Sequence, residues 1–132
     1  MPGSMQIAWS HLVPDMKTLL FVHTSSPHGS IKAQEGLDAL LMGSAFADCT
    51  ALFLGDGILQ LLKNQDTQQT GQKNFSLTFG SLQDYGVDKV FCSKTHLLNH
   101  DIDESDLVID VTALEDKDIA TLLASHDVIL NF

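Results

Sequence analysis

The sequence contains no arginine: all seven of its basic residues are lysines, against 17 aspartates and glutamates. The formal net charge of the 132-residue chain is −10. Nucleic acids are held mainly by phosphate contacts from lysine and arginine, and the arginine fork favours two-point contacts. We therefore expect no direct binding of nucleic acid. If the protein acts in an RNA pathway, another protein must hold the RNA.

Cysteine and long apolar runs are also scarce. Cys49 and Cys92 are too few and too far apart for a disulfide framework or a zinc knuckle. No apolar run has the length needed to cross a bilayer. The first fifteen residues have neither the positive region nor the continuous apolar region of a secretory signal. We expect a cytoplasmic protein with reduced thiols and no membrane contact.

The length predicts one domain with an ordinary hydrophobic core. The opening residues MPGS are typical of a cloning remnant, and Met16 directly precedes the first apolar run. We therefore predict that residues 1–15 are a tag or another non-native extension, and that residues 16–132 form the domain.

The segment from Lys17 to Leu62 predicts a β-α-β unit. Its continuous apolar run at 19–22 is typical of a strand that helices cover on both faces. A small-residue loop follows at 24–30, and its last residue, Ser30, can cap the next helix. A helix is expected next, because Leu37, Leu40, Leu41, Ser44, Ala45 and Asp48 fall at helical spacing. A second strand is expected at 50–54.

The remaining sequence continues this alternation of strands and helices. It predicts, in order, a short helix at 58–63, a surface loop at 64–74, a helix at 75–85, a strand at 87–92, a short helix capped by Ser93, a strand at 107–111, a helix with a capping box of Thr112 and Glu115, and a strand at 126–132. We therefore predict an α/β fold of three layers, in which helices cover both faces of a mainly parallel, five-stranded sheet, as in flavodoxin-like and Rossmann-like proteins.

Cys92 is the first candidate for chemistry. It ends the third predicted strand, directly before the helix start at Ser93, and carboxyl ends of strands form the usual functional edge of such sheets. A thiol near a helix N-terminus ionises more readily, and the thiolate is the form that attacks sulfur. The alternative is that Cys92 is a small apolar side chain at a strand end, as buried free cysteines commonly are.

Cys92, His96 and His100 are spaced by four residues, so one continuous helix would place them on the same face. A thiolate and two imidazoles could bind zinc, or His96 could act as a base for Cys92. A fourth ligand is not evident in the sequence. We favour surface histidines and expect no metal.

The hydroxyl-rich loop after the first strand permits a different hypothesis. Thr24, Ser26 and Ser30 precede a helix and could hold the phosphate of FMN, as in a small flavodoxin-like protein. Their spacing is loose, and Tyr85 and Trp9 are the remaining rings, besides several phenylalanines, that could stack on the flavin. We favour a tight turn at this loop and expect no cofactor.

Five phrases occur in the order found in one known family. They are SPHG at 26–29, EGLDALLMGSAFAD at 35–48, LFLGDGILQLL at 52–62, VFCSKTHL around Cys92, and DVILNF at 127–132. Over nearly all of residues 16–132 the chain resembles the DsrE/DsrF-like family. Within it, the chain is similar to the C-type subunits of the sulfur relay that makes 2-thiouridine in tRNA.

This resemblance implies a cytoplasmic subunit that assembles with B-type and D-type sister subunits as a dimer of trimers. The complex takes persulfide sulfur from a donor and passes it to an E-type acceptor protein, and the sulfur ends on the wobble uridine of tRNA. In the family the relay cysteine belongs to the D-type subunit, and Cys92 resembles its positional counterpart. We expect a chiefly structural and regulatory, non-catalytic subunit, with Cys92 as a candidate carrier. Expressed alone, the chain could form a homo-oligomer.

Overall fold

The computed structural model describes residues 17–28, 30–62, 79 and 82–132. Its centre is a five-stranded sheet in the order β4-β3-β2-β1-β5, in which every neighbouring pair is parallel. The strands are β1 (Thr18–His23), β2 (Asp48–Phe53), β3 (Val90–Ser93), β4 (Thr112–Leu114) and β5 (Val128–Asn131). This arrangement confirms the predicted α/β class.

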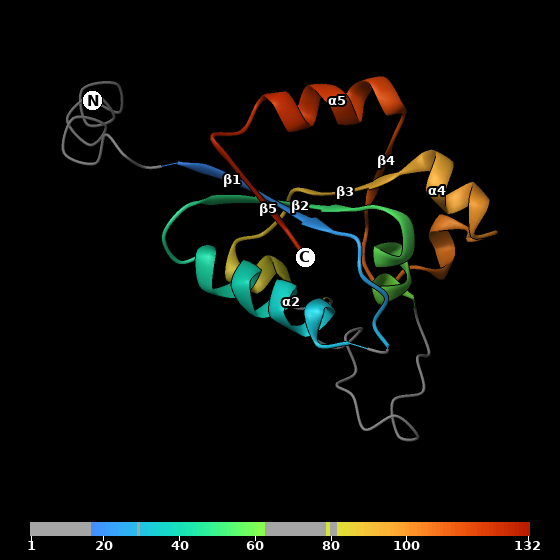
Figure 1. Ribbon diagram of the computed structural model, residues 1–132, viewed down its shortest axis with the longest axis horizontal. Coiled ribbons are helices and arrows are strands. Elements are labelled where there is room, and N and C mark those ends of the chain that lie inside the picture. Colours follow the sequence, from blue (N-terminus) through green and yellow to red (C-terminus); the bar gives the residue numbers. More distant parts are fainter. Residues whose placement is uncertain (1–16, 29, 63–78, 80–81) are drawn as a thin grey trace.

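Helices cover both faces of the sheet. They are α2 (Lys32–Gly43), α4 (Lys94–Asn99) and α5 (Asp116–Ala124), together with the 3-10 helices η1 (Gly55–Leu61), η2 (Leu82–Tyr85) and η3 (Glu104–Asp106). Figure 1 shows α5 on one side of the strands and α2 on the other. Among the described residues, no helix has the length and hydropathy that a bilayer-spanning segment requires.

Strand β1 divides the hydrophobic core into two clusters, because successive side chains of a strand point to opposite faces. Phe21 packs in the larger cluster with Leu37 and Leu40 of α2. Leu20 and Val22 pack in the smaller cluster, which includes residues of α5. Each of these side chains is almost fully buried, which stabilises the fold by roughly 2 kcal/mol per side chain. The continuous apolar run at 19–22 is thus explained by burial on both faces.

The first predicted helix ends earlier than the sequence pattern suggested. α2 stops at Gly43, whereas the prediction continued it to Asp48, which instead begins β2. Gly43 lies so close to Phe21 that a Cβ at this position would be 2.9 Å from the ring. Asp48 is tied to the sheet through Lys89, whose Nζ lies 2.9 Å from its carboxylate. Tertiary packing therefore overrides the helical spacing beyond the glycine.

The predicted strand at 107–111 is also wrong. Leu107 forms an isolated antiparallel bridge with Leu62, and the Val108 N–H donates to the Leu61 carbonyl oxygen at 2.8 Å. These contacts hold the segment against η1, so the strand that pairs with β3 begins only at Thr112.

The predicted capping box at this point is wrong for the same reason. Thr112 lies in β4, and the N-cap of α5 is Glu115, which makes no side-chain capping bond.

Three predictions fall wholly or mostly outside the described residues. They concern the extension at 1–15, the loop at 64–74 and most of the helix at 75–85. The described end of that last segment is the 3-10 helix η2 (Leu82–Tyr85), which stops at Gly86 with a φ of 82°. Glycine adopts this left-handed conformation without steric cost.

Candidate functional site

The carboxyl ends of the strands lie at one edge of the sheet, because all five strands are parallel. Loops at this edge carry the functional groups in most open α/β sheets. Here they are the segment after β1, the 3-10 helix η1 after β2, and α4 after β3.

Cys92 lies at this edge but is fully buried. In the sheet it is the register partner of Phe53 on β2 and of Ala113 on β4. Burial raises the pKa of the Cys92 thiol to about 11, and the negative charge of Glu104 adds to the increase. The thiol is therefore protonated at neutral pH. The expected lowering of its pKa by the helix N-terminus is not what the structure shows.

The helix start after Cys92 is the one that the sequence predicted. Ser93 is the N-cap of α4, and its hydroxyl accepts a hydrogen bond from the His96 N–H at 3.1 Å. α4 has six residues, so its dipole is short. At the thiol, burial is the largest cause of the pKa shift, and it raises the pKa.

His96 and His100 contact the loop after β2 rather than Cys92. Nδ1 of His96 accepts a hydrogen bond from the Gly55 N–H at 2.8 Å. Nε2 of His100 lies 3.5 Å from a carboxylate oxygen of Asp56. The two histidines, four residues apart, therefore connect α4 to η1. In the part of the chain that the structure describes, no three His, Cys, Asp or Glu side chains are placed to hold a metal ion.

The hydroxyls of the loop after β1 already take part in local hydrogen bonds. Thr24 Oγ1 donates to the Phe132 carbonyl oxygen at 3.2 Å. Ser26 Oγ accepts from the His28 N–H, and Ser30 Oγ accepts from the Lys32 N–H, both at 3.3 Å. This geometry favours the tight turn over the phosphate-binding loop of the flavin hypothesis. Ser30 precedes the N-cap of α2, which is Ile31.

His23 ends β1 and is fully buried, although no motif in the sequence marks it as a candidate. Its ring stacks on Phe53 with the centroids 4.6 Å apart, and Phe132 lies 6.3 Å away. Neither ring nitrogen has a hydrogen-bond partner among the described residues. Burial lowers the pKa of His23 to about 3, so the ring is neutral and packs like an apolar aromatic group. The only signal in the sequence was its place directly after an apolar run.

Cys49 is the other thiol, and it lies within β2 rather than ahead of the strand. Its side chain is buried in the larger core cluster. Burial raises its pKa, the charge of Asp48 adds to the increase, and Lys89 opposes it. Cys49 therefore behaves as a small core residue.

Comparison with known proteins assigns the fold and the family. The family model described as DsrE/DsrF-like matches residues 17–132. The "Protein TusC homolog" of Aliivibrio fischeri is 39% identical over 118 residues, which are 89% of this chain and 100% of that protein. "Protein TusC" of Buchnera aphidicola subsp. Acyrthosiphon pisum is 32% identical over 119 residues, with the same coverage of both chains.

A solved structure has the same fold. The crystal structure of the ychN protein from E. coli superposes with a TM-score of 0.74 and covers 89% of this chain and 99% of that chain. The two sequences are 19% identical, so the likeness supports the fold alone.

Proposed function

The chain belongs to the DsrE/DsrF-like family, and from that premise we propose that it is a subunit of a cytoplasmic sulfur-relay complex. The complex passes persulfide sulfur toward 2-thiolation of the wobble uridine in tRNA. The observation that carries the proposal is the match to proteins named TusC along their whole length. The chain would therefore take the C-type position in the complex, as one domain over residues 16–132.

The partners in this proposal are proteins. TusB-like and TusD-like sister subunits join the chain in a heterohexamer, a dimer of trimers, and a TusE-like protein accepts the sulfur. The net charge of −10 and the absence of arginine support this division of labour, because they disfavour contact with tRNA phosphates. The tRNA is then held elsewhere in the pathway.

We assign the chain a chiefly structural and regulatory role in the complex. The burial of Cys92 and its raised pKa support this role, because a sulfur carrier needs an accessible thiolate. Co-expression with the neighbouring sister subunits, followed by native mass measurement, tests the assembly. A chain that stays alone under these conditions contradicts the proposed subunit role.

A second candidate function is that Cys92 itself carries sulfur. Its place at the carboxyl end of β3, directly before the capped helix α4, favours this candidate. The Cys92 thiolate would attack the outer sulfur of a donor persulfide. The sulfur–sulfur bond of the donor breaks, the donor leaves as a thiolate, and Cys92 becomes the persulfide.

The variant Cys92→Ser separates the two roles in the assembled complex. Unchanged sulfur transfer to the acceptor supports the structural role. Loss of transfer, together with the mass of one added sulfur atom on Cys92 in the wild-type complex, supports the carrier role.

A further inference from the structure

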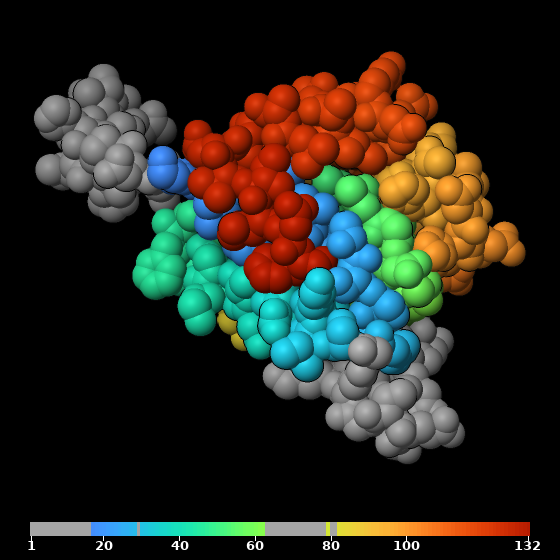
Figure 2. Space-filling view, viewed as in Figure 1, coloured from blue at the N-terminus to red at the C-terminus, as the bar shows by residue number. Residues whose placement is uncertain are grey.

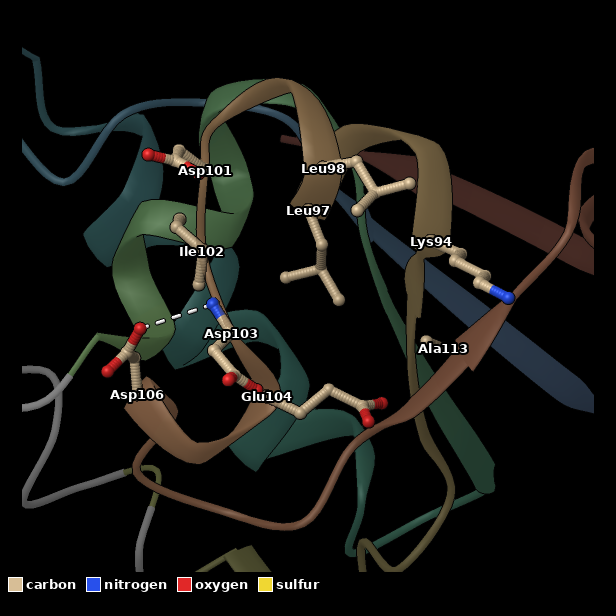
Figure 3. Close-up of a pocket in the computed structure, with 9 residues that line it drawn as sticks. All are labelled: Lys94, Leu97, Leu98, Asp101, Ile102, Asp103, Glu104, Asp106 and Ala113. Atoms are coloured by element: carbon tan, nitrogen blue, oxygen red, sulfur yellow. Dashed lines mark hydrogen bonds between the residues drawn. The ribbon is translucent and has the colours of Figure 1, made fainter.

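An open cavity of about 590 Å³ lies between α4, η3 and β4. Its volume is within the range of ordinary binding pockets in proteins. Leu97 of α4, Ile102 of the following turn and Ala113 of β4 form its apolar part. Figure 3 shows Leu97 and Leu98 on α4, with Ile102, Asp103 and Glu104 on the neighbouring segment. In Figure 2 the segment that contains α4 and η3 is orange and forms one end of the described molecule, beside the red α5.

Leu98 gives this cavity an apolar rim. Its side chain is 71% exposed, whereas its neighbour Leu97 is 4% exposed and belongs to the core. Apolar surface that remains in water favours association with another apolar group. A leucine exposed beside a partly apolar cavity is therefore a suitable contact for an inserted apolar side chain.

Four carboxylates also line the cavity, and Lys94 is the single cation among its described lining residues. They belong to Asp101, Asp103, Glu104 and Asp106. Within the described residues, none of them forms an ion pair with a cation.

Two of these carboxylates are fixed by the backbone. Asp106 accepts from the Asp103 N–H at 3.1 Å, and Asp103 accepts from the Ser105 N–H at 3.3 Å. The negative rim is thus partly preorganised, and its carboxylates form no ion pair within the described chain.

We propose that this cavity is a docking site for a segment of a partner protein that carries an apolar side chain flanked by lysines or arginines. The apolar side chain enters between Leu97, Leu98 and Ile102, and the cations face the acidic rim. Charge complementarity of this kind steers association and selects the partner. A second copy of this chain is a poor occupant, because it too carries a charge of −10. A nucleic acid is a poor occupant for the same reason.

This site goes beyond the proposed function, because it defines the chemistry of one contact without assuming sulfur transfer. The test measures binding of two short fluorescein-labelled peptides to the full chain by fluorescence anisotropy at low salt. One peptide has two leucines flanked by lysines, and the other has the same leucines flanked by glutamates. We expect the lysine peptide to bind at least about tenfold more tightly, and its affinity to fall as salt is added.

Matched variants locate the binding. Leu98→Ser and Glu104→Gln should each weaken binding of the lysine peptide several-fold. Met42→Ser removes an equally exposed apolar side chain on α2, and Asp84→Asn removes one carboxylate outside the cavity. Both controls should bind like the wild type.

Equal weakening by all four variants would mean non-specific attraction to an acidic protein, and it would overturn the proposal. Absence of binding, or equal affinity for the two peptides, would overturn it as well. Circular dichroism of each variant confirms that the fold is retained.

Discussion

His23 and Phe53 stack face to face at the carboxyl ends of β1 and β2, with their ring planes 13° apart. The two residues are also register partners in the sheet. The imidazole therefore occupies a position that an apolar aromatic ring could fill. Because it is buried without a hydrogen-bond partner among the described residues, it is held in the neutral form.

The burial of this neutral imidazole predicts that the fold loses stability in acid. The pKa of His23 is about 3 in the folded chain and about 6.5 when unfolded, so the unfolded chain binds the extra proton between these values. Stability is full above about pH 6.5 and falls as the pH drops toward 3. The contribution of His23 alone should lower the free energy of unfolding by about 2 kcal/mol between pH 7 and pH 5.

The variant His23→Phe should lose this part of the pH dependence, because it has no group to protonate. Urea unfolding at several pH values gives the free energy of unfolding of the variant and of the wild type. The effect of His23 is the difference between the two chains in how steeply this free energy depends on pH. His28→Gln, which changes an exposed histidine, is the control. If the free energy of unfolding of His23→Phe depends on pH as it does in the wild type, His23 is not the source of the acid sensitivity.

The thiol of Cys92 should resist alkylation in the folded chain. Its pKa of about 11 and its burial leave little accessible thiolate at pH 7.5. Iodoacetamide should label it at least about tenfold more slowly than in urea. Mass mapping of the labelled peptide separates it from Cys49. Rapid labelling of Cys92 in the folded chain would contradict the buried position.

The charge of Glu104 makes a second prediction for the same thiol. Glu104→Gln should lower the pKa of Cys92 and speed its alkylation by less than about tenfold, because burial remains the larger cause. The pH dependence of the labelling rate measures this change. Asp84→Asn alters the net charge equally and should leave the rate unchanged.

The cap of α4 should contribute measurably to stability. Ser93→Ala removes the hydroxyl that accepts from the His96 N–H, and we expect a loss of about 1 kcal/mol. Ser125→Ala changes a hydroxyl near the exposed end of α5 and serves as the control. Urea unfolding at pH 7.5 gives both values. Equal losses in the two variants would argue against a specific capping effect.

Two glycines of η1 should differ sharply on substitution. A Cβ at Gly57 would collide with the backbone carbonyl of His23, so Gly57→Ala should destabilise the chain by roughly 3 kcal/mol. Gly55 has a φ of 53° and open space around it, so Gly55→Ala should cost only about 1 kcal/mol. Gly55→Asn should cost less, since asparagine tolerates this conformation. Thermal unfolding ranks the three variants.

The order of the elements could be predicted from local patterns. The apolar run at 19–22, the helical spacing that begins α2, and Ser93 as an N-cap all depend on nearby residues. The segment at 107–111 could not be predicted in this way. Its apolar side chains pack on the larger core cluster, and the segment is held there by the bridge from Leu107 to Leu62 and the bond from Val108 to Leu61, which are distant in sequence.

The properties of the candidate site depended even more on tertiary structure. Sequence position placed Cys92 next to a helix start, which is correct, but the sign of its pKa shift follows from its burial in the larger core cluster. His96 and His100 lay at ligand-like spacing, yet their partners, Gly55 and Asp56, come from a loop about forty residues earlier. Local spacing alone could not predict either contact.

Two backbone hydrogen bonds and one ring contact hold Phe132, the last residue of the sequence, in place. The Phe132 N–H donates to the Val22 carbonyl oxygen at 2.9 Å, its own carbonyl oxygen accepts from the Thr24 N–H at 2.8 Å, and its ring stacks near Phe21. A fluorophore or affinity peptide fused after Phe132 would begin beside the turn that leaves β1. Such a fusion would report on conformational changes at that turn, but it would also perturb the turn. A purification tag that must not affect the structure is therefore better attached elsewhere on the molecule.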